Sequence, residues 1–141
     1  MISSWVVIID VKVDKVLILK RSRIVKNPGQ WCFPGGSAKN KNPIKLAKTE
    51  AFEEVGIEYK KKDLTSIIEL TIGKSKNYHY YIAFAKEGFK IRLDKESKAF
   101  KWVKLKSLER HKNQHGSIKS FVKKINEEKY NMIKNKITNT V

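Results

Sequence analysis

Residues 35–57 read GGSAKNKNPIKLAKTEAFEEVGI, and this stretch decides the fold. It predicts a glycine-rich loop followed by a helix from Pro43 to Val55. Asn42 is a good N-cap, and proline suits the first position of a helix. Gly56 can adopt the left-handed conformation that ends a helix. Between these ends, apolar residues at helical spacing predict that one face packs against the rest of the protein: Ile44, Ala47, Ala51 and Val55, broadened by Leu46 and Phe52.

Three carboxylates lie on one face of this predicted helix. Glu50, Glu53 and Glu54 are spaced at i, i+3 and i+4, so their side chains are neighbours and repel one another. They lie in the last turns, where the helix dipole does not favour negative charge. A hard divalent cation, which prefers oxygen ligands, would relieve this repulsion. The spacing alone also fits a solvated glutamate-rich surface, and the glycine-rich segment in front favours the metal site.

The segment resembles the Nudix box, whose family pattern is G-x5-E-x7-R-E-U-x-E-E-x-G-U, with U an apolar residue. The second half matches closely in EAFEEVGI, residues 50–57. The lead-in GQWCFPGG at residues 29–36 resembles the family strand that runs into Pro-Gly-Gly, and VLILKRS at residues 16–22 resembles the strand before it. With the later strands, the resemblance covers residues 3 to about 125. It implies an α/β/α sandwich with a mixed β-sheet, against which the box helix lies.

Two positions depart from the family pattern. Thr49 stands where the family has an arginine, and Lys41 stands nearest the place of the loop glutamate. In the family, the arginine is thought to orient the adjacent glutamate, and the loop glutamate adds negative charge near the metals. Their joint replacement indicates either a rewired site or a catalytically weak relative. The three retained helix carboxylates favour continued hydrolysis.

The resemblance implies a diphosphate hydrolase that uses Mg²⁺ or Mn²⁺. The catalytic residues would be Glu50, Glu53 and Glu54. The metal ligands would be the same glutamates, the backbone carbonyl of Gly35, and Glu96 as a further ligand or base. Glu96 begins a segment that resembles the family's late E-x5-W, although it fits an exposed loop residue equally well. Five residues are expected to bind substrate. Arg21 is the basic residue after the second strand, and Lys41 is a loop lysine that could contact phosphate. The others are the aromatic residue Phe33 and the glycines Gly35 and Gly36.

Length and composition fit one small enzyme domain. The 141 residues predict a single domain, with a core over about residues 3–125 and a terminal helix and tail over residues 117–141. No apolar run approaches the roughly 20 residues that a membrane span needs. The first residues lack the features of a signal peptide, and Cys32 alone cannot form an internal disulfide. We therefore expect a cytoplasmic protein without a membrane partner.

The net charge indicates anionic partners. It is +17, from 31 Lys and Arg against 14 Asp and Glu. Such an excess attracts polyanions, including nucleotides and RNA. The lysines are spread along the chain beside many Asn and Ile residues, which also fits the composition of a protein from an AT-rich genome. RNA therefore stands as a further partner beside a nucleotide-like diphosphate substrate, and a homodimer is considered because many relatives dimerise.

Other segments predict the remaining strands and helices. They also include aromatic and histidine residues whose role in binding is open. Runs of β-branched and aromatic residues predict strands at 5–10, 16–20, 31–33, 64–72, 78–85, 89–93 and 100–103. A short helical turn is expected at 107–110, and a helix that Ser117 caps, with a tail that frays beyond about residue 130. Aromatic side chains such as Trp5, Phe33 and Tyr78 could stack on a base, although core packing is the commoner role. His111 and His115 are expected to be exposed.

Two classes of function follow from the sequence. The first is a divalent-metal-dependent hydrolase that cleaves the diphosphate linkage of a nucleoside diphosphate joined to another group. Such compounds include nucleoside triphosphates, dinucleoside polyphosphates and nucleotide sugars or cofactors. The alternative is a catalytically weak protein of the same fold that binds a nucleotide or RNA.

Overall fold

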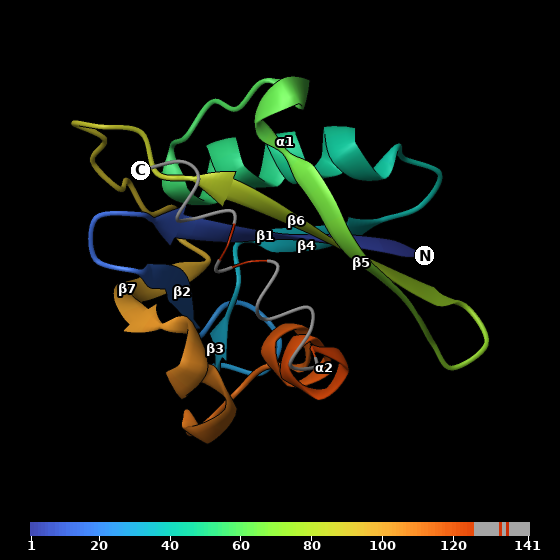
Figure 1. The fold of residues 1–141 in the computed structure, drawn as a ribbon. Coiled ribbons are helices and arrows are strands. Elements are labelled where there is room, and N and C mark those ends of the chain that lie inside the picture. The colour runs from blue at the N-terminus through green and yellow to red at the C-terminus, as the bar shows by residue number, and fades with distance from the viewer. Residues whose placement is uncertain (126–132, 134, 136–141) are drawn as a thin grey trace.

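The protein is built on a mixed β-sheet with helices on both faces (Figure 1). The structure is a computed structural model that describes residues 1–125, 133 and 135. Within residues 1–125 the helices are α1, Pro43–Val55, and α2, Gly116–Lys124, with short 3-10 helices η1, Lys61–Asp63, and η2, Leu105–Arg110. The described strands are β1, Ile2–Asp10; β2, Lys15–Arg21; β3, Trp31–Cys32; β4, Gly35–Ala38; β5, Thr65–Ile72; β6, Lys76–Phe84; and β7, Ser97–Lys104.

Strand β1 is the centre of the sheet. It pairs in parallel with β6, from Ile2 opposite Asn77 to Ile9 opposite Phe84. It pairs antiparallel with β2 and with β4, while β3 and β7 pair with β2 and β5 pairs with β6. Residues 3–9 of β1 are all buried, as expected for a strand with both faces covered. The predicted α/β/α sandwich with a mixed sheet is confirmed.

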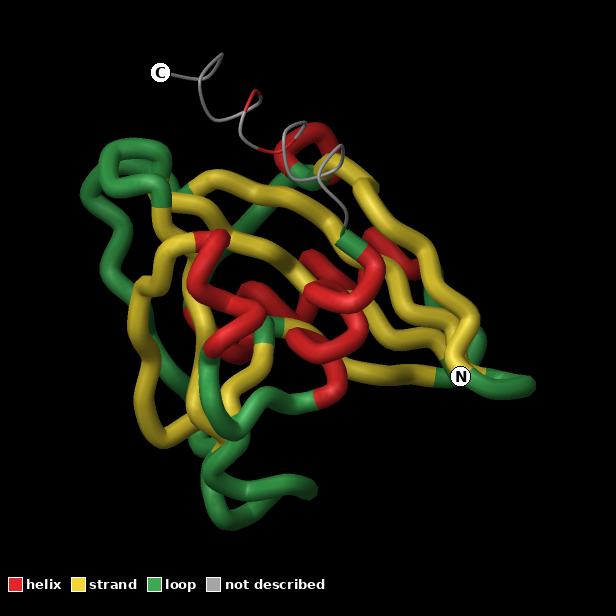
Figure 2. Tube along the Cα trace, turned by 60° about the horizontal axis from the view of Figure 1, so that its bottom comes forward, coloured by secondary structure: helices red, strands yellow, loops and turns green. Residues whose placement is uncertain are grey.

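The two faces of the sheet form two apolar clusters. Alternation along β1 sends Val6 and Ile8 toward α1, whereas Val7 and Ile9 point toward α2. Figure 1 shows the two helices on opposite sides of the sheet. In Figure 2 the loops gather at the strand ends, which leaves the middle of the sheet to the helices. In the described part of the chain, no helix is long and apolar enough to cross a membrane.

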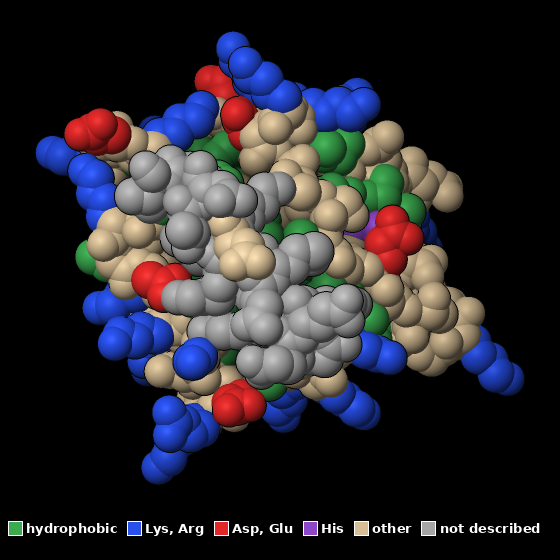
Figure 3. Space-filling model, in the orientation of Figure 1, with side chains coloured by type: hydrophobic (Ala, Val, Ile, Leu, Met, Phe, Trp, Pro, Cys, Tyr) green, Lys and Arg blue, Asp and Glu red, His purple; other side chains and the backbone are tan. Residues whose placement is uncertain are grey.

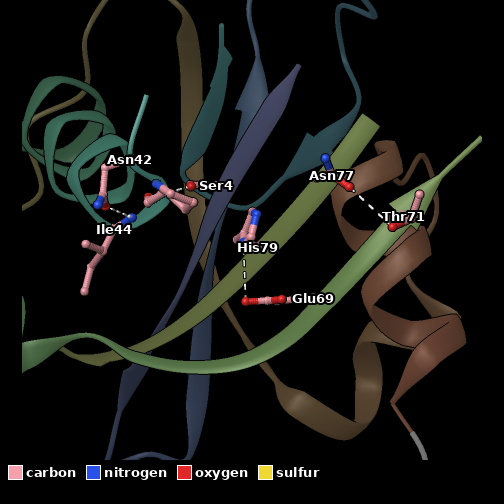
Figure 4. Close-up of polar contacts among 8 residues, drawn as sticks. Ser4, Asn42, Ile44, Glu69, Thr71, Asn77 and His79 are labelled. Carbon is pink, nitrogen blue, oxygen red and sulfur yellow. Dashed lines mark hydrogen bonds and ion pairs between the residues drawn. The ribbon is translucent and has the colours of Figure 1, made fainter. Parts of the chain in front are cut away.

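Helix α1 has the predicted bounds and both predicted ends. The side chain of Asn42 accepts hydrogen bonds from the backbone amides of Ile44, at 3.0 Å, and Lys45, at 3.3 Å. Gly56 follows the helix with φ of 79°, the left-handed conformation expected of it. The Ser4 hydroxyl donates to the Pro43 carbonyl at 2.6 Å and ties the start of the helix to β1 (Figure 4). The helix is therefore fixed to the sheet at the end away from its glutamates.

The glycine-rich segment is a strand rather than the predicted loop. Residues 35–38 form β4 because β1 begins at Ile2 and offers its first residues for pairing, from Ile2 opposite Ala38 to Trp5 opposite Gly35. The hydroxyls of Ser3 and Ser37 also lie 2.5 Å apart across this pair. A β-carbon on Gly35 would overlap the Ser4 carbonyl oxygen and the Trp5 ring, so only glycine fits there. Sequence patterns do not show this pairing, since it joins residues that are 30 to 36 positions apart.

Three other expectations need correction or qualification. Residues 89–93 form no strand; Phe89, Ile91 and Leu93 instead pack as partly buried loop residues against the cluster on the α1 side. Helix α2 is capped by His115 rather than by Ser117, whose buried hydroxyl accepts from the Phe33 amide. Most of the tail predicted to fray lies outside the described residues.

We expect Gly35→Ala to lower the free energy of unfolding by about 2–3 kcal/mol, because the new methyl group overlaps backbone and ring atoms in the middle of the sheet. Gly116→Ala is the matched control, since its β-carbon would meet only the Tyr78 hydroxyl, at 3.8 Å. Its stability should change by no more than about 0.5 kcal/mol. Urea denaturation of the two variants measures both effects, and equal losses would contradict the packing assigned to Gly35.

Stability should also depend on the protonation of His115. Its Nδ1 accepts a hydrogen bond from the Ser117 amide at 3.1 Å, which only the neutral ring can do. Burial and the nearby Arg21 lower the pKa of His115 to about 4. The folded pKa is thus below the unfolded value of about 6.5. The stabilisation is present above pH 6.5 and is lost as the pH falls through 4.

His115→Asn separates this effect from other titrations, because asparagine caps helices well and does not ionise. At pH 7 we expect the variant and the parent protein to have similar stability. At pH 4 the parent should have lost about 1–2 kcal/mol relative to the variant, a value reduced for partial exposure of the ring. Urea denaturation at pH 7, 5.5 and 4 measures the difference, and a constant difference would rule out the role of the neutral ring.

Candidate functional site

A cavity of about 530 Å³ opens where β1, β4 and the second half of α1 meet three loops. The helix contributes glutamates, and the loop after β2 contributes basic and polar groups. The loop before β7 and the start of α2 close the remaining sides. The lining residues are Trp5, Arg21, Val25, Lys26, Asn27, Cys32, Gly35, Gly36, Ser37, Glu50, Glu53, Glu54, Lys76, Tyr78, Glu96, Ser97, His115 and Gly116.

The three glutamates of α1 all line this cavity, and β4 positions two of them. Glu54 is only 7% exposed, and its Oε2 accepts a hydrogen bond from the Gly35 amide at 2.7 Å. Glu50 lies beside Gly36, where a β-carbon would come within 2.6 Å of a Glu50 carboxylate oxygen. The two glycines therefore let the strand backbone approach the carboxylates closely. Glu53 is exposed at the mouth.

Burial and the negative charges of neighbouring carboxylates make Glu50 and Glu54 hold protons more tightly. The pKa of Glu50 is raised to about 7, first by burial and then by the negative charges of Glu53, Glu96 and Asp94. The pKa of Glu54 is raised well above its ordinary value, mainly by burial, against the stabilising hydrogen bond from Gly35. Near neutral pH the cluster is thus short of positive charge, which protons or a cation must supply.

A loop distant in sequence completes the acidic cluster. Asp94 turns the chain before β7, with its Oδ1 accepting from the Glu96 amide at 3.0 Å. The Glu96 carbonyl in turn accepts from the Ser22 amide at 2.9 Å, which fixes the loop against the end of β2. Both acidic residues are close enough to raise the pKa of Glu50 and of Glu54. Sequence reasoning considered Glu96 and missed Asp94, because no motif marks it.

The donor set fits a divalent cation, although the side chains are not yet arranged around one point. In the part of the chain that the structure describes, no three Asp, Glu, His or Cys side chains already form a metal-binding group. The raised pKa values show carboxylates crowded together with too little countercharge. Oxygen donors of this kind suit Mg²⁺ or Mn²⁺. Glu50, Glu53, Glu54 and Glu96 all line this cavity and are the residues that could hold such an ion.

The wall formed by the loop after β2 carries positive charge. Arg21 donates from Nε to the Lys26 carbonyl at 2.6 Å, and one terminal nitrogen lies 4.0 Å from the Cys32 sulfur. The first contact holds the loop closed and places the guanidinium in the cavity wall with Lys26 and Asn27. Cys32 is buried, and burial raises the pKa of its thiol to about 12, so it is not a reactive nucleophile.

Aromatic rings form one end of the cavity, which lies near enough to Arg21 for its charge to act on His115. Trp5 meets Tyr78 edge to face with ring centres 5.9 Å apart, and meets His115 in the same way at 5.6 Å. Lys76 and Gly116 complete this end. His115 was expected to be exposed in a polar connection, and the structure instead places it in the cavity wall. Only the tertiary fold brings it there, since it lies 110 positions from Trp5.

The structure separates the predicted substrate residues into two groups. Arg21, Gly35 and Gly36 line the cavity with the glutamates. Phe33 does not: it is fully buried and packs edge to face on Phe121 at 5.2 Å, so its expected contact with substrate is wrong. It points to the α2 side of the sheet, whereas its neighbour Cys32 points to the cavity side.

The two departures from the box pattern lie at the helix surface near Glu50. Lys41 is exposed outside the cavity wall, and its charge lowers the pKa of Glu50 without overcoming the acidic neighbours. Thr49 donates its hydroxyl to the Lys45 carbonyl at 3.0 Å within the helix. Because the Thr49 hydroxyl already donates its proton within the helix, it does not donate a hydrogen bond to the glutamates.

Solved structures of known proteins share this fold. The chain is 21% identical to a MutT NUDIX hydrolase from Burkholderia pseudomallei, with a TM-score of 0.69 over 89% of this chain and 97% of that one. It is 23% identical to the dihydroneopterin triphosphate pyrophosphohydrolase of E. coli, with a TM-score of 0.61 over 88% and 96% of the two chains. Identities this low establish the fold alone.

A third structure is longer than this chain. It is a bifunctional NMN adenylyltransferase/ADP ribose pyrophosphatase from Francisella tularensis, in complex with AMP and a manganese ion. Identity is 17% and the TM-score 0.56, over 98% of this chain and 41% of that one, so the chain spans less than half of its length. No curated protein matches the sequence. The family model of the NUDIX domain matches residues 2–124, nearly the whole described chain. The protein therefore belongs to the NUDIX domain family.

Proposed function

We propose that this protein is a divalent-metal-dependent hydrolase that cleaves the diphosphate linkage of a nucleoside diphosphate joined to another group. The candidates are nucleoside triphosphates, dinucleoside polyphosphates and nucleotide sugars or cofactors. The observation that carries the proposal is the acidic cluster of Glu50 and Glu54 against the Gly35–Gly36 backbone, facing Arg21 across one cavity. Family membership supports the reaction class, and the AMP bound in the Francisella tularensis neighbour supports the substrate class.

In this proposal each wall of the cavity has a separate task. Glu50 and Glu54 would hold Mg²⁺ or Mn²⁺, and Glu53, Glu96 and the Gly35 carbonyl would be further ligands. When bound, the ion supplies positive charge to the phosphate oxygens and lowers the pKa of water. Arg21 and Lys26 hold the anionic oxygens of the substrate from the opposite wall, where a guanidinium can make two parallel hydrogen bonds.

The reaction itself adds water across a phosphorus–oxygen bond. A water oxygen attacks one phosphorus, the bond from that phosphorus to the bridging oxygen breaks, and each product keeps one phosphate end. A carboxylate at the mouth of the cavity accepts the proton that the water loses. Glu53 and Glu96 are both exposed at the cavity and are the candidates for this base.

The second candidate function is a nucleotide-binding protein with weak catalysis. It is favoured by Lys41 and Thr49, because neither residue supplies the charge or the contact expected at its place in the box. RNA binding has less support, since Lys and Arg side chains are spread around the face seen in Figure 3 rather than gathered in one patch. RNA binding would be indicated if the logarithm of the affinity for RNA fell linearly as the logarithm of the salt concentration rose. A homodimer and a cytoplasmic location also remain proposals.

The first experiment is product analysis across a panel of nucleoside diphosphate-linked compounds, with Mg²⁺, with Mn²⁺ and with a chelator. Turnover of one compound that the chelator abolishes supports the hydrolase and identifies its substrate class. Metal-dependent binding without turnover of any compound supports the nucleotide-binding alternative. Turnover that persists in chelator contradicts the metal role of the glutamates.

We expect Glu54→Gln to reduce turnover by at least about 100-fold, because it removes a charged metal ligand. The fold should survive, since a glutamine oxygen can still accept the Gly35 amide. Without metal the variant should be at least as stable as the parent protein, because it no longer buries an ionisable group. Steady-state kinetics and thermal unfolding in chelator measure these two results.

Glu58→Gln is the matched control for this variant. Glu58 is exposed just past the end of α1, and its carboxylate lies outside the cavity wall. Its turnover should stay within about twofold of the parent protein, since distant surface substitutions have small effects. If a folded Glu54→Gln protein were as active as Glu58→Gln, the assignment of Glu54 would be wrong.

A further inference from the structure

We propose that the aromatic end of the cavity is a subsite for a planar, nucleobase-like ring, and that the Trp5 indole N–H is its hydrogen-bond donor. The subsite is formed by Trp5, Tyr78 and His115, with Lys76 beside them. The inference rests on the proposed function, because it concerns the part of the substrate that does not react. It assigns a specificity residue outside the family box.

Trp5 carries an unsatisfied polar group in the wall of the cavity. The residue is 4% exposed, and its Nε1 is buried with no hydrogen-bond partner among the described residues. Buried donors in proteins almost always have an acceptor, and leaving one unpaired is destabilising. Since Trp5 belongs to the cavity wall, a ligand that brings an acceptor supplies the missing partner.

The neighbouring rings can admit such a ligand. Tyr78 and His115 are both partly exposed, and each meets the Trp5 ring edge to face rather than stacking on it. We infer that one of these rings turns aside when the ligand binds, which gives access to the indole N–H and presents an aromatic face. Aromatic faces stack well on nucleobases. His115 is neutral, because its Nδ1 accepts from the Ser117 amide, so it adds no charge to this apolar surface.

The subsite lies at the right place relative to the acidic cluster. Gly35 stands between them: its amide holds Glu54, and a β-carbon on it would overlap the Trp5 ring. A ring bound at Trp5 therefore leaves the Gly35–Gly36 backbone for the sugar and places the phosphates toward Glu50 and Glu54. The cavity thus has one end for the base and one end for the diphosphate.

The donor also defines the chemistry of the ring. An indole N–H only donates, so the edge of the ring that faces Trp5 must carry a carbonyl oxygen or an unprotonated ring nitrogen. A sugar phosphate or a polyphosphate without a base offers acceptor oxygens but no flat ring to lie against the aromatic side chains. The subsite therefore selects a nucleotide over other phosphorylated compounds.

The indole protons of the chain give a direct test. The sequence has three tryptophans, so a ¹⁵N-labelled protein shows three indole N–H signals, which Trp31→Phe and Trp102→Phe assign. The probes are AMP, GMP, CMP and UMP, which contain no diphosphate linkage to hydrolyse, with inorganic phosphate as the base-free control. We expect at least one nucleotide to shift the Trp5 signal saturably, while phosphate does not. A Trp5 signal that none of the four nucleotides moves overturns the proposal.

Substitution provides the second test. Trp5→Phe removes the donor and keeps an aromatic ring, and we expect it to weaken binding of the responding nucleotide about 10-fold while affinity for inorganic phosphate is unchanged. Trp102→Phe, on β7 in a different hollow, should bind the nucleotide as the parent protein does. Equal nucleotide affinity in a folded Trp5→Phe protein overturns the proposal. If that variant does not fold, the signal of Trp5 in the parent protein decides.

These measurements do not depend on turnover. A nucleotide-specific shift at Trp5 in a protein that hydrolyses none of the panel would retain the subsite and reject the hydrolase. Turnover of nucleotides with an unmoved Trp5 signal would retain the hydrolase and reject the subsite.

Discussion

The hydrogen bond from the Gly35 amide to the Glu54 carboxylate is the contact on which the rest of the site depends. At 2.7 Å it joins β4 to the last turn of α1, and it stabilises a carboxylate that burial alone would keep protonated. A charged acceptor makes such a bond stronger than an ordinary backbone contact. The bond requires β4 to pair with the start of β1, which brings a residue without a side chain into the gap between Trp5 and the helix.

The net charge of the whole molecule and the charge at the site have opposite signs. The whole chain carries a net charge of +17, which attracts anionic ligands over a long range. Five of the 14 acidic residues lie close together at the site, and their negative charges add to burial in raising the pKa of Glu50 and of Glu54. An anionic substrate is therefore drawn to the protein and repelled at the site itself. A divalent cation resolves the conflict, because it satisfies the carboxylates and the phosphates together.

The sequence predictions were correct where an element depends on contacts between residues close in sequence, and wrong where it depends on contacts between distant segments. The bounds of α1 and both of its ends were correct, because capping by Asn42 and the left-handed Gly56 act within a few residues. The strands expected at 5–10 and 16–20 were also correct and lie within β1 and β2, because alternation and runs of β-branched residues are local signals. The strand at 35–38 was missed, and a strand at 89–93 was wrongly expected. Both depend on whether a distant edge is free for pairing, which no local pattern records.

The sequence by itself determined α1, the shared face of Glu50, Glu53 and Glu54, and the family to which the chain belongs, because helical spacing and capping are local. Only the tertiary structure decided what stands opposite that face. It moved Phe33 into the core while Cys32 turned to the cavity, and it brought Asp94 and His115 to the site from distant loops. The physical reason is that strand register sets the side to which each residue points, and a shift of one residue would exchange the two faces.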